Sequence, residues 1–410
     1  MKRFEVHAGW MSPPELIGIC SIENARGKEM ISFSYAESWL MQHSGLILDP
    51  DIYPMSGRQF PPDGKLCFGF LKDIAPDRWG RTLMKRMEAI SAREENRTKR
   101  TLMESDFILG VNDAGRIGGI RLYDPVQNIY VSNGSILAIP PMEMLRKLED
   151  ASVHFENNES DEDKWLKNLI EPGSSLGGAR PKANVIDEKG NIWIAKFPSK
   201  RDEYDVGAWE MVAHELAIRC GLDVPRAQLR KLSKYGSTFM TERFDRDGEI
   251  RIHFSSAMTM LGQTDDSNDE IGYIDIAEAT ERICERPTED LHELFNRMIF
   301  NICISNTDDH LRNHGFVLGK SGWKLSKGYD INPANDKEEM SLYILDTKRK
   351  NPDEAIDAAE YFRLTKDDAK QRASRIHQIV SNNWRIEADK YQISRAEQSM
   401  MQDAFADYSD

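Results

Sequence analysis

The sequence has no long apolar segment. No run of about 18 or more apolar residues occurs among its 410 residues, which excludes an ordinary membrane-spanning helix. The first residues, from Met1 to His7, carry charge and a histidine where a secretion signal needs an apolar stretch. We therefore expect a protein of the cytoplasm with no membrane partner.

Cysteine is scarce, and basic residues are fewer than acidic ones. No Cys-x-x-Cys pair occurs, so neither a disulfide framework nor a zinc ribbon is predicted, and we expect reduced thiols. With 54 Lys and Arg against 68 Asp and Glu, the net charge is -14 at pH 7. This charge disfavours wide non-specific binding to nucleic acid or anionic lipid, because its field repels phosphate. The five cysteines are Cys20, Cys67, Cys220, Cys284 and Cys303.

The composition is that of a soluble globular protein, with 40% hydrophobic and 30% charged residues. The length is enough for two or three domains. Short apolar runs separated by turn residues predict strands up to about residue 125, with a helical run through Leu83, Met84 and Met87 among them, and strands with one helix over 173–254. Beyond residue 255 the pattern is mostly helical. We therefore expect three domains, which comprise residues 1–125, 126–254 and 255–410.

Local patterns predict several elements around the candidate motifs. Residues 181–187 and 191–197 flank a Glu-Lys-Gly turn and predict a hairpin, and residues 237–244 and 249–254 bracket Asp247-Gly248, the strongest two-residue hairpin signal. A helix is expected over 208–220 with Gly221 as its stop. Apolar residues at helical spacing from Leu291 to Cys303 predict one face of a long buried helix.

A glycine-rich segment opens the hairpin that begins at residue 181. It reads Gly-Ser-Ser-Leu-Gly-Gly-Ala-Arg-Pro-Lys over residues 173–182. Its glycines would let backbone N–H groups curl around an anion. It is not a Walker A loop, because the Gly-Lys-Ser/Thr ending and an immediate helix are absent. A flexible turn between domains remains the alternative interpretation.

Lys196 lies in an apolar strand, and Glu210 follows it near the start of the next helix. Burying a lysine is costly unless it meets an anion. A strand lysine and a helix glutamate form the ion pair with which protein kinases hold the phosphates of ATP. The alternatives are an edge lysine that points to solvent and an exposed helix carboxylate.

A polar cluster follows the long buried helix directly. Asp308 and Asn313 are five residues apart, the spacing of the catalytic Asp and the metal-binding Asn in kinases. Residues 316–318 and 323–325 predict a small hairpin that leads to Tyr329-Asp330. In kinases a loop, a hairpin and a second metal-binding Asp follow in this order. A helix cap followed by a turn is the structural alternative.

Six ordered motifs together resemble the HipA family of serine/threonine kinases, the kinase components of bacterial toxin-antitoxin pairs. The resemblance covers nearly the whole chain. The motifs are Pro-Asp-Arg-Trp-Gly-Arg at 76–81, the glycine segment at 175–182, Gly-Leu-Asp-Val-Pro at 221–225, Glu-Arg-Phe-Asp at 242–245, the cluster at 307–313 and Tyr329-Asp330. The resemblance implies an α+β, two-lobed protein-kinase-like fold with an added strand-rich N-terminal domain and a mostly helical C-terminal lobe.

The resemblance also implies ATP and Mg²⁺ as cofactors, with roles carried over by matching motif. Asp308 would be the catalytic base, and Asn313 and Asp330 would bind Mg²⁺. Lys196 would contact the phosphates of ATP and pair with Glu210. The other nucleotide contacts would come from the glycine loop and from a hinge beside adenine, namely Ser175, Gly177, Gly178, Ala179, Lys182, Glu242, Arg243 and Phe244.

Ser175 matches the loop serine whose autophosphorylation silences members of this family. The implied partners are a protein substrate, for which the family's best-known class is a tRNA-charging enzyme, and a small DNA-binding antitoxin. DNA would then be contacted only indirectly. The chain departs from the family's pattern in two places. Arg180-Pro181 stiffens the glycine loop, and Ser255-Ser256 stands where many members have an acidic pair.

Two other functions remain open. A divalent-metal hydrolase would use Asp308, Asp309, His310 and His314, since the two histidines lie four residues apart and could share a helix face. The glycine and the strand that follow would end such a helix at once, and Lys196 would have no role. A catalytically idle kinase fold that only binds a partner is disfavoured, because every catalytic position is filled. Turnover of ATP distinguishes the three.

Overall fold

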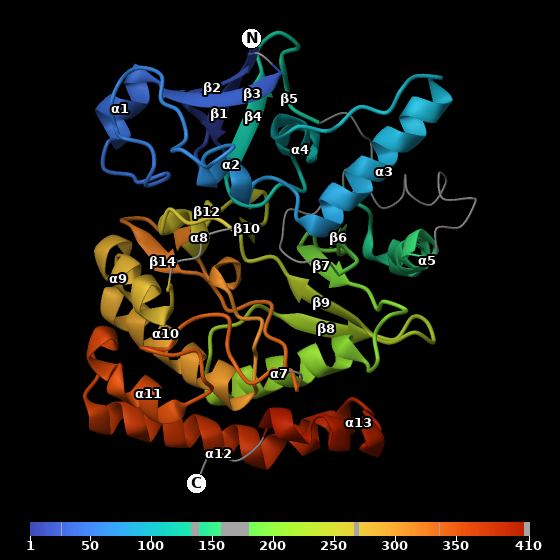
Figure 1. Cartoon of the computed structure of the whole chain (residues 1–410), viewed down its shortest axis with the longest axis vertical. Helices are drawn as coiled ribbons and strands as arrows, with labels where there is room; N and C mark the ends of the chain where they lie inside the picture. The colour runs from blue at the N-terminus through green and yellow to red at the C-terminus, as the bar shows by residue number, and fades with distance from the viewer. Residues whose placement is uncertain (26, 133–138, 157–179, 266–269, 336, 406–410) are drawn as a thin grey trace. The chain divides into compact units, whose positions relative to one another are not determined.

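A computed structural model of the chain describes residues 1–25, 27–132, 139–156, 180–265, 270–335 and 337–405 (Figure 1). The chain divides into two compact units. Unit 1 comprises Met1–Lys200, Arg243–Ser255 and Gly262–Thr264, and unit 2 comprises Arg201–Glu242, Ser256–Leu261 and Asp265–Asp410. The three domains expected from the sequence stay a prediction. Among the described residues, no helix combines the length and the apolar character needed to cross a membrane.

Unit 1 contains a five-stranded sheet with the order β3-β2-β1-β4-β5, and its strand pairs are antiparallel. Alternate residues of β1, namely Phe4, Val6 and Ala8, are buried, which confirms the predicted strand pattern. Helices α1 and α2 add Trp39 and Phe70 to the same core. The elements are β1 (Lys2–Ala8), β2 (Glu15–Ala25), β3 (Lys28–Tyr35), α1 (Glu37–His43), α2 (Gly69–Asp73), β4 (Ile120–Asp124) and β5 (Ile129–Tyr130).

Helix α3 (Arg78–Glu94) begins in the Pro-Asp-Arg-Trp-Gly-Arg motif. Asp77 caps it, because its Oδ1 accepts the N–H of Gly80 at 2.7 Å. The other carboxylate oxygen lies 3.2 Å from Nζ of Lys182, and both side chains are buried. Arg81 pairs with Glu104 at the start of α4 (Glu104–Gly110). The motif therefore joins α3 both to α4 and to the strand that begins at Lys182.

The hairpin predicted after the glycine segment is confirmed as β6 (Lys182–Ile186) and β7 (Ile192–Lys196), which pair antiparallel. The prediction around Asp247-Gly248 was wrong in its extent and pairing. The turn joins only two-residue strands, β10 (Arg246–Asp247) and β11 (Ile250–Arg251). The preceding strand, β9 (Thr238–Glu242), pairs instead with β8 (Ala227–Arg230) in unit 2. Helix α5 (Leu145–Glu156) precedes β6 in the chain, and strand β12 (Phe254–Ser256) follows β11.

Unit 2 is mostly helical. The predicted helix near residue 208 is confirmed as α7 (Val206–Cys220), which Asp205 caps and which ends at Gly221 in a left-handed conformation. The long buried helix is α10 (Pro287–Cys303), and α12 (Lys366–Lys390) is capped by Thr365, whose side chain accepts the N–H of Asp368. The remaining elements are α8 (Ala257–Met260), α9 (Tyr273–Ile283), β13 (Gly315–Leu318), β14 (Trp323–Leu325), α11 (Pro352–Asp357) and α13 (Arg395–Met400).

Candidate active site

The loop that carries the polar cluster begins at the C-terminal end of α10. The N–H groups of Ser305 and Asn306 bond to the carbonyls of Ile302 and Asn301, at 3.1 and 2.8 Å. Ser305 has a φ of 52°, so the chain leaves the helix through a Schellman motif with serine in the position that usually holds glycine. This ending turns the chain away from the helix axis and fixes where the following loop starts.

Asp308 and Asp309 are neighbours with opposite environments. Asp308 is exposed, whereas Asp309 is 2% exposed. The carboxylate of Asp309 accepts hydrogen bonds from Tyr273 and Asn301 and contacts Nε2 of His314 at 2.9 Å. Burial alone would raise the pKa of Asp309, but attraction to His314 and these hydrogen bonds hold it below its usual value. Asp309 thus anchors the loop, while Asp308 is accessible to a substrate.

The loops that carry Asn313 and Asp330 are tied together. Nδ2 of Asn313 donates to the carbonyl of Asp308 at 3.1 Å, which curls the loop upon itself. The hydroxyl of Tyr329 donates to the carbonyl of Arg312 at 2.7 Å. Tyr329 directly precedes Asp330 and Arg312 directly precedes Asn313, so this hydrogen bond connects the two loops. Asp330 has a φ of 57°, a left-handed conformation that Asp tolerates better than most residues and that is concentrated at functional sites. The carboxylate and amide oxygens there are hard donors of the kind that Mg²⁺ prefers.

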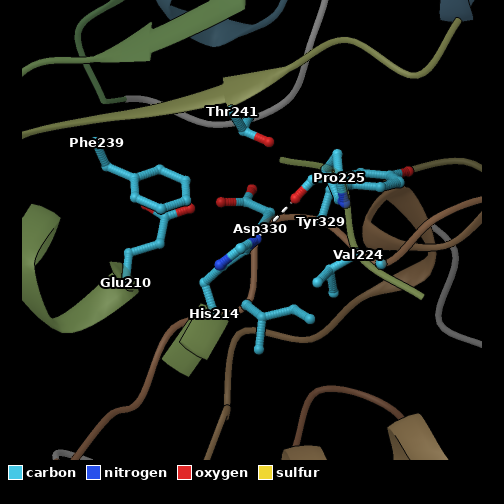
Figure 2. Close-up of a pocket in the computed structure, with 10 residues that line it drawn as sticks. Glu210, His214, Val224, Pro225, Phe239, Thr241, Tyr329 and Asp330 are labelled. Carbon is cyan, nitrogen blue, oxygen red and sulfur yellow. Dashed lines mark hydrogen bonds between the residues drawn. The ribbon is translucent and has the colours of Figure 1, made fainter. Parts of the chain in front are cut away.

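A small pocket in unit 2 lies beside this loop (Figure 2). Glu210 and His214 project into it from α7, and Asp330 lies opposite them. Glu210 is 3% exposed. The pocket is about 20 Å³, which is room for one water molecule rather than for a nucleotide. Residues of α7 and of the segment that carries Asp330 thus line the same small pocket.

The remaining predicted nucleotide contacts are spread over both units. Lys196 is buried on β7 of unit 1, so its pairing with Glu210 of unit 2 stays a prediction. Lys182 lies beside Asp77. The Arg243 guanidinium binds Asp245 and the carbonyls of two loop residues of unit 1, at 2.6 to 2.9 Å. The side chains of Lys182 and Arg243 are thus engaged within unit 1.

Two further predicted hinge residues also have partners within their own units. Glu242 forms an ion pair with Arg226, and the ring of Phe244 lies 5.9 Å from that of Phe254. Ser175, Gly177, Gly178 and Ala179 lie outside the described residues. Their roles as nucleotide contacts stay predictions.

The structure contradicts the shared helix face that the hydrolase alternative requires of its two histidines. His310 precedes a short 3₁₀ turn (Leu311–Asn313), and His314 is extended, so the two share no helix face. His314 is directed at Asp309 instead. Within the described ranges, no group of three or more His, Cys, Asp or Glu side chains is arranged to hold a metal ion.

Sequence reasoning missed two residues of this region. Tyr273, at the start of α9, holds Asp309 from 36 positions away, a contact that no local pattern could indicate. His214 lies one helical turn after Glu210, and this spacing was the signal that could have identified it.

The chain is similar to known proteins in sequence and in fold. The family model described as the HipA-like C-terminal domain matches residues 174–384, just over half of the chain. Two relatives come from Sinorhizobium fredii. The protein named "Putative kinase Y4mE" is 24% identical over 326 residues, which cover 73% of this chain and 71% of the relative. "Putative kinase Y4dM" is 28% identical over 35% of this chain and 37% of its own length.

A solved structure from Shewanella oneidensis is also similar. It is titled as a toxin-antitoxin system of HipA, HipB and their operator DNA. The matching chain has a TM-score of 0.66 and 17% identity, and the match covers 98% of this chain and 95% of that one. The α+β, kinase-like fold predicted from the sequence is confirmed.

Proposed function

The chain belongs to the family of the HipA-like C-terminal domain, and from this premise we propose that it is an ATP- and Mg²⁺-dependent serine/threonine protein kinase. The observation that carries the proposal is the pair of tied loops in unit 2. One loop carries the exposed Asp308, whose carbonyl accepts a hydrogen bond from Asn313, and the other carries Asp330. The names of the Sinorhizobium relatives support the same reaction class.

Each of these residues has a defined task in this reaction. Asp308 orients the attacking hydroxyl and accepts its proton, which requires an accessible carboxylate. Asn313 and Asp330 would hold Mg²⁺, which neutralises charge on the phosphates when bound. Lys196 binds phosphate oxygens, and Glu210 orients the lysine. Buried Asp309 holds the loop in place through its contacts with Tyr273, Asn301 and His314.

Coupling between metal and nucleotide tests the proposal. Asp330→Ala and Asn313→Ala each remove a hard oxygen ligand from a site that also uses phosphate oxygens. We expect both variants to lose most of the Mg²⁺-dependent gain in ATP affinity, measured by titrating ATP with and without Mg²⁺. Asn335→Ala is a matched control, because Asn335 is exposed in the same segment and its amide donates to the carbonyl of Met400 rather than to Asp330. Unchanged coupling in both variants would exclude the kinase interpretation of this loop.

Turnover of ATP distinguishes the proposed kinase from its alternatives. A metal hydrolase would act without nucleotide, and an idle kinase fold would bind ATP without consuming it. Phosphate transfer to serine or threonine, identified by mass spectrometry of a phosphorylated protein, would separate a protein kinase from an ATPase.

We further propose regulation by autophosphorylation of Ser175. A phosphate there would add about -1.5 to -2 charges beside the triphosphate and compete for the same backbone N–H groups. ATP binding should then be lost. Incubation with ATP followed by mapping of phosphosites tests this. Phosphate on Ser174 alone, or on neither serine while an external substrate is phosphorylated, would contradict it.

The biological setting we propose is that of a toxin with a small DNA-binding antitoxin. The similar Shewanella chain comes from a complex of HipA, HipB and operator DNA, and the acidic net charge of this chain agrees with an indirect contact to DNA. A tRNA-charging enzyme is the proposed substrate class. A gel-shift assay with a candidate antitoxin tests the partner: DNA should bind the antitoxin, alone or with this chain, but not this chain alone.

A further inference from the structure

The Gly-Leu-Asp-Val-Pro motif has no task in the proposed reaction so far. It follows α7 directly, and its last three residues, 223–225, form a short connection before β8. We call residues 223–225 the bridge segment. Its backbone makes hydrogen bonds to three different parts of unit 2, which together carry Glu210, Asp330 and Asp308.

The first part is α7. Nε2 of His214 donates to the carbonyl of Pro225 at 2.7 Å. Since a carbonyl only accepts, Nε2 carries a proton, and burial lowers the pKa of His214 and so favours the neutral imidazole. His214 is 8% exposed and lies one turn from Glu210. A shift of the bridge segment would therefore displace the face of α7 from which Glu210 projects.

The second part is the segment before Asp330. The N–H of Gly328 donates to the carbonyl of Asp223 at 2.8 Å, and Lys327 pairs with the Asp223 carboxylate. A Cβ added at Gly328 would lie 3.3 Å from Cδ1 of Ile331 and 3.5 Å from Cγ1 of Val224. The contact with Val224 is an ordinary van der Waals distance and that with Ile331 is only slightly tight, so a side chain larger than that of alanine would have to displace one of the two.

The third part is α10, whose C-terminal end begins the loop of Asp308. Glu293 accepts the N–H of Asp223 at 3.0 Å, and Arg297 contacts both Glu293 and the carbonyl of Asp223, at 2.8 and 3.4 Å. These contacts hold the bridge segment against α10, the helix that leads into the loop of Asp308.

We propose that the bridge segment sets the position of Glu210 relative to Asp330, and that His214 is the positioning residue through which it acts on α7. This inference rests on the proposed kinase function. His214 touches no reacting atom in this account. The hydrogen bond from its Nε2 to Pro225 fixes the position of α7 relative to the segment that carries Asp330 (Figure 2). That position in turn determines how well the site binds Mg²⁺ and ATP together.

Three substitutions of His214 separate the tasks of its two ring nitrogens. Gln can place its amide N–H where Nε2 lies, whereas Asn places its amide near Nδ1, and Leu offers neither. Nδ1 is buried and has no hydrogen-bond partner among the described residues. We expect His214→Leu and His214→Asn to lower kcat and to raise the Mg²⁺ concentration for half-maximal rate by about tenfold, as loss of one buried hydrogen bond implies. His214→Gln should stay within about threefold of the unsubstituted protein.

Two further variants complete the experiment. Gly328→Leu removes no main-chain hydrogen bond, but its side chain extends beyond a Cβ that already contacts Val224 and Ile331, so it should displace the bridge segment and raise the Mg²⁺ requirement in the same direction. His292→Leu, at a half-buried histidine of α10 that contacts Arg372, is the matched control and should leave the Mg²⁺ dependence unchanged. Thermal unfolding of every variant identifies any that fail to fold.

The outcomes separate this inference from the proposed function. An unsubstituted protein that neither turns over ATP nor couples ATP binding to Mg²⁺ overturns the proposed function. An active protein in which folded His214→Leu and Gly328→Leu keep the original Mg²⁺ dependence overturns only the proposed role of the bridge segment. Rescue by Asn and not by Gln also overturns it, because the effect would then belong to Nδ1.

Discussion

Adjacent Asp308 and Asp309 show how far a residue's task depends on its surroundings. The spacing to Asn313 was enough to select Asp308 from the sequence. The task of Asp309 was not predictable, because Tyr273 and Asn301 reach it from other elements. A motif can thus indicate which residue performs chemistry, whereas the residues that hold the motif in place are set by tertiary contacts.

Substitution of each aspartate should have a different consequence. Asp308→Ala should lower the rate of phosphoryl transfer by about 10²–10⁴-fold, as removal of a general base does, with stability unchanged because the side chain is exposed. Asp309→Ala should lower the free energy of unfolding by about 3 kcal/mol or more, since it leaves buried His314 and Tyr273 without their acceptor. Rate assays and urea unfolding of both variants test this. Near-normal turnover of Asp308→Ala with stable, inactive Asp309→Ala would reverse the assignment.

Among the elements, those fixed by local signals were predictable. Helix α10 follows from apolar spacing, and the β6–β7 and β13–β14 hairpins follow from their turns. The partner of β9 was not predictable, because β8 and the segment at residue 249 are both close in sequence and nothing local decides between them. The start of α3 was found only as part of a motif, and its contact with Lys182 spans 105 positions.

That contact gives a prediction about α3. Asp77→Ala removes both the helix cap and the anion beside buried Lys182, and should lower the free energy of unfolding by about 3–5 kcal/mol. The double variant Asp77→Asn with Lys182→Met keeps a capping side chain and leaves no buried charge. It should recover most of the loss. Urea unfolding of both variants tests this, and equal losses in the two would contradict the account.

At the scale of the whole molecule, the chain passes between the units more than once. Arg243–Ser255 belongs to unit 1 although the chain on either side of it lies in unit 2. Asp245 holds it there, because its carboxylate accepts the N–H of Gly118 at 2.6 Å and pairs with Arg243 and Arg246. Burial would raise the pKa of Asp245, but the two guanidinium groups hold it well below its usual range. The resemblance to the HipA family implied a nucleotide hinge here and did not indicate that Arg243 pairs with a buried carboxylate.

The same returning segment should make the stability of unit 1 sensitive to acid. His253 is 2% exposed, and its ring stacks on that of Trp10 with centroids 4.5 Å apart. Burial lowers the pKa of His253 to about 3, from 6.5 in the unfolded chain. Above pH 6.5 the ring is neutral in both states and its contribution to stability is complete. Between pH 6.5 and 3 only the unfolded chain gains the proton, so stability falls as the pH falls.

At pH 5 this loss amounts to about 2 kcal/mol of the free energy of unfolding relative to pH 8. His253→Phe keeps a ring against Trp10 but cannot bind a proton, so it should lack this part of the pH dependence. Urea unfolding of both proteins at pH 8 and pH 5 measures the difference, and the other titrating groups, common to both, cancel. Relative to that of the unsubstituted protein, the free energy of unfolding of His253→Phe should be about 2 kcal/mol higher at pH 5 than at pH 8. Parallel pH curves would mean that the folded protein accepts the proton on His253, and that the returning segment opens to water in acid.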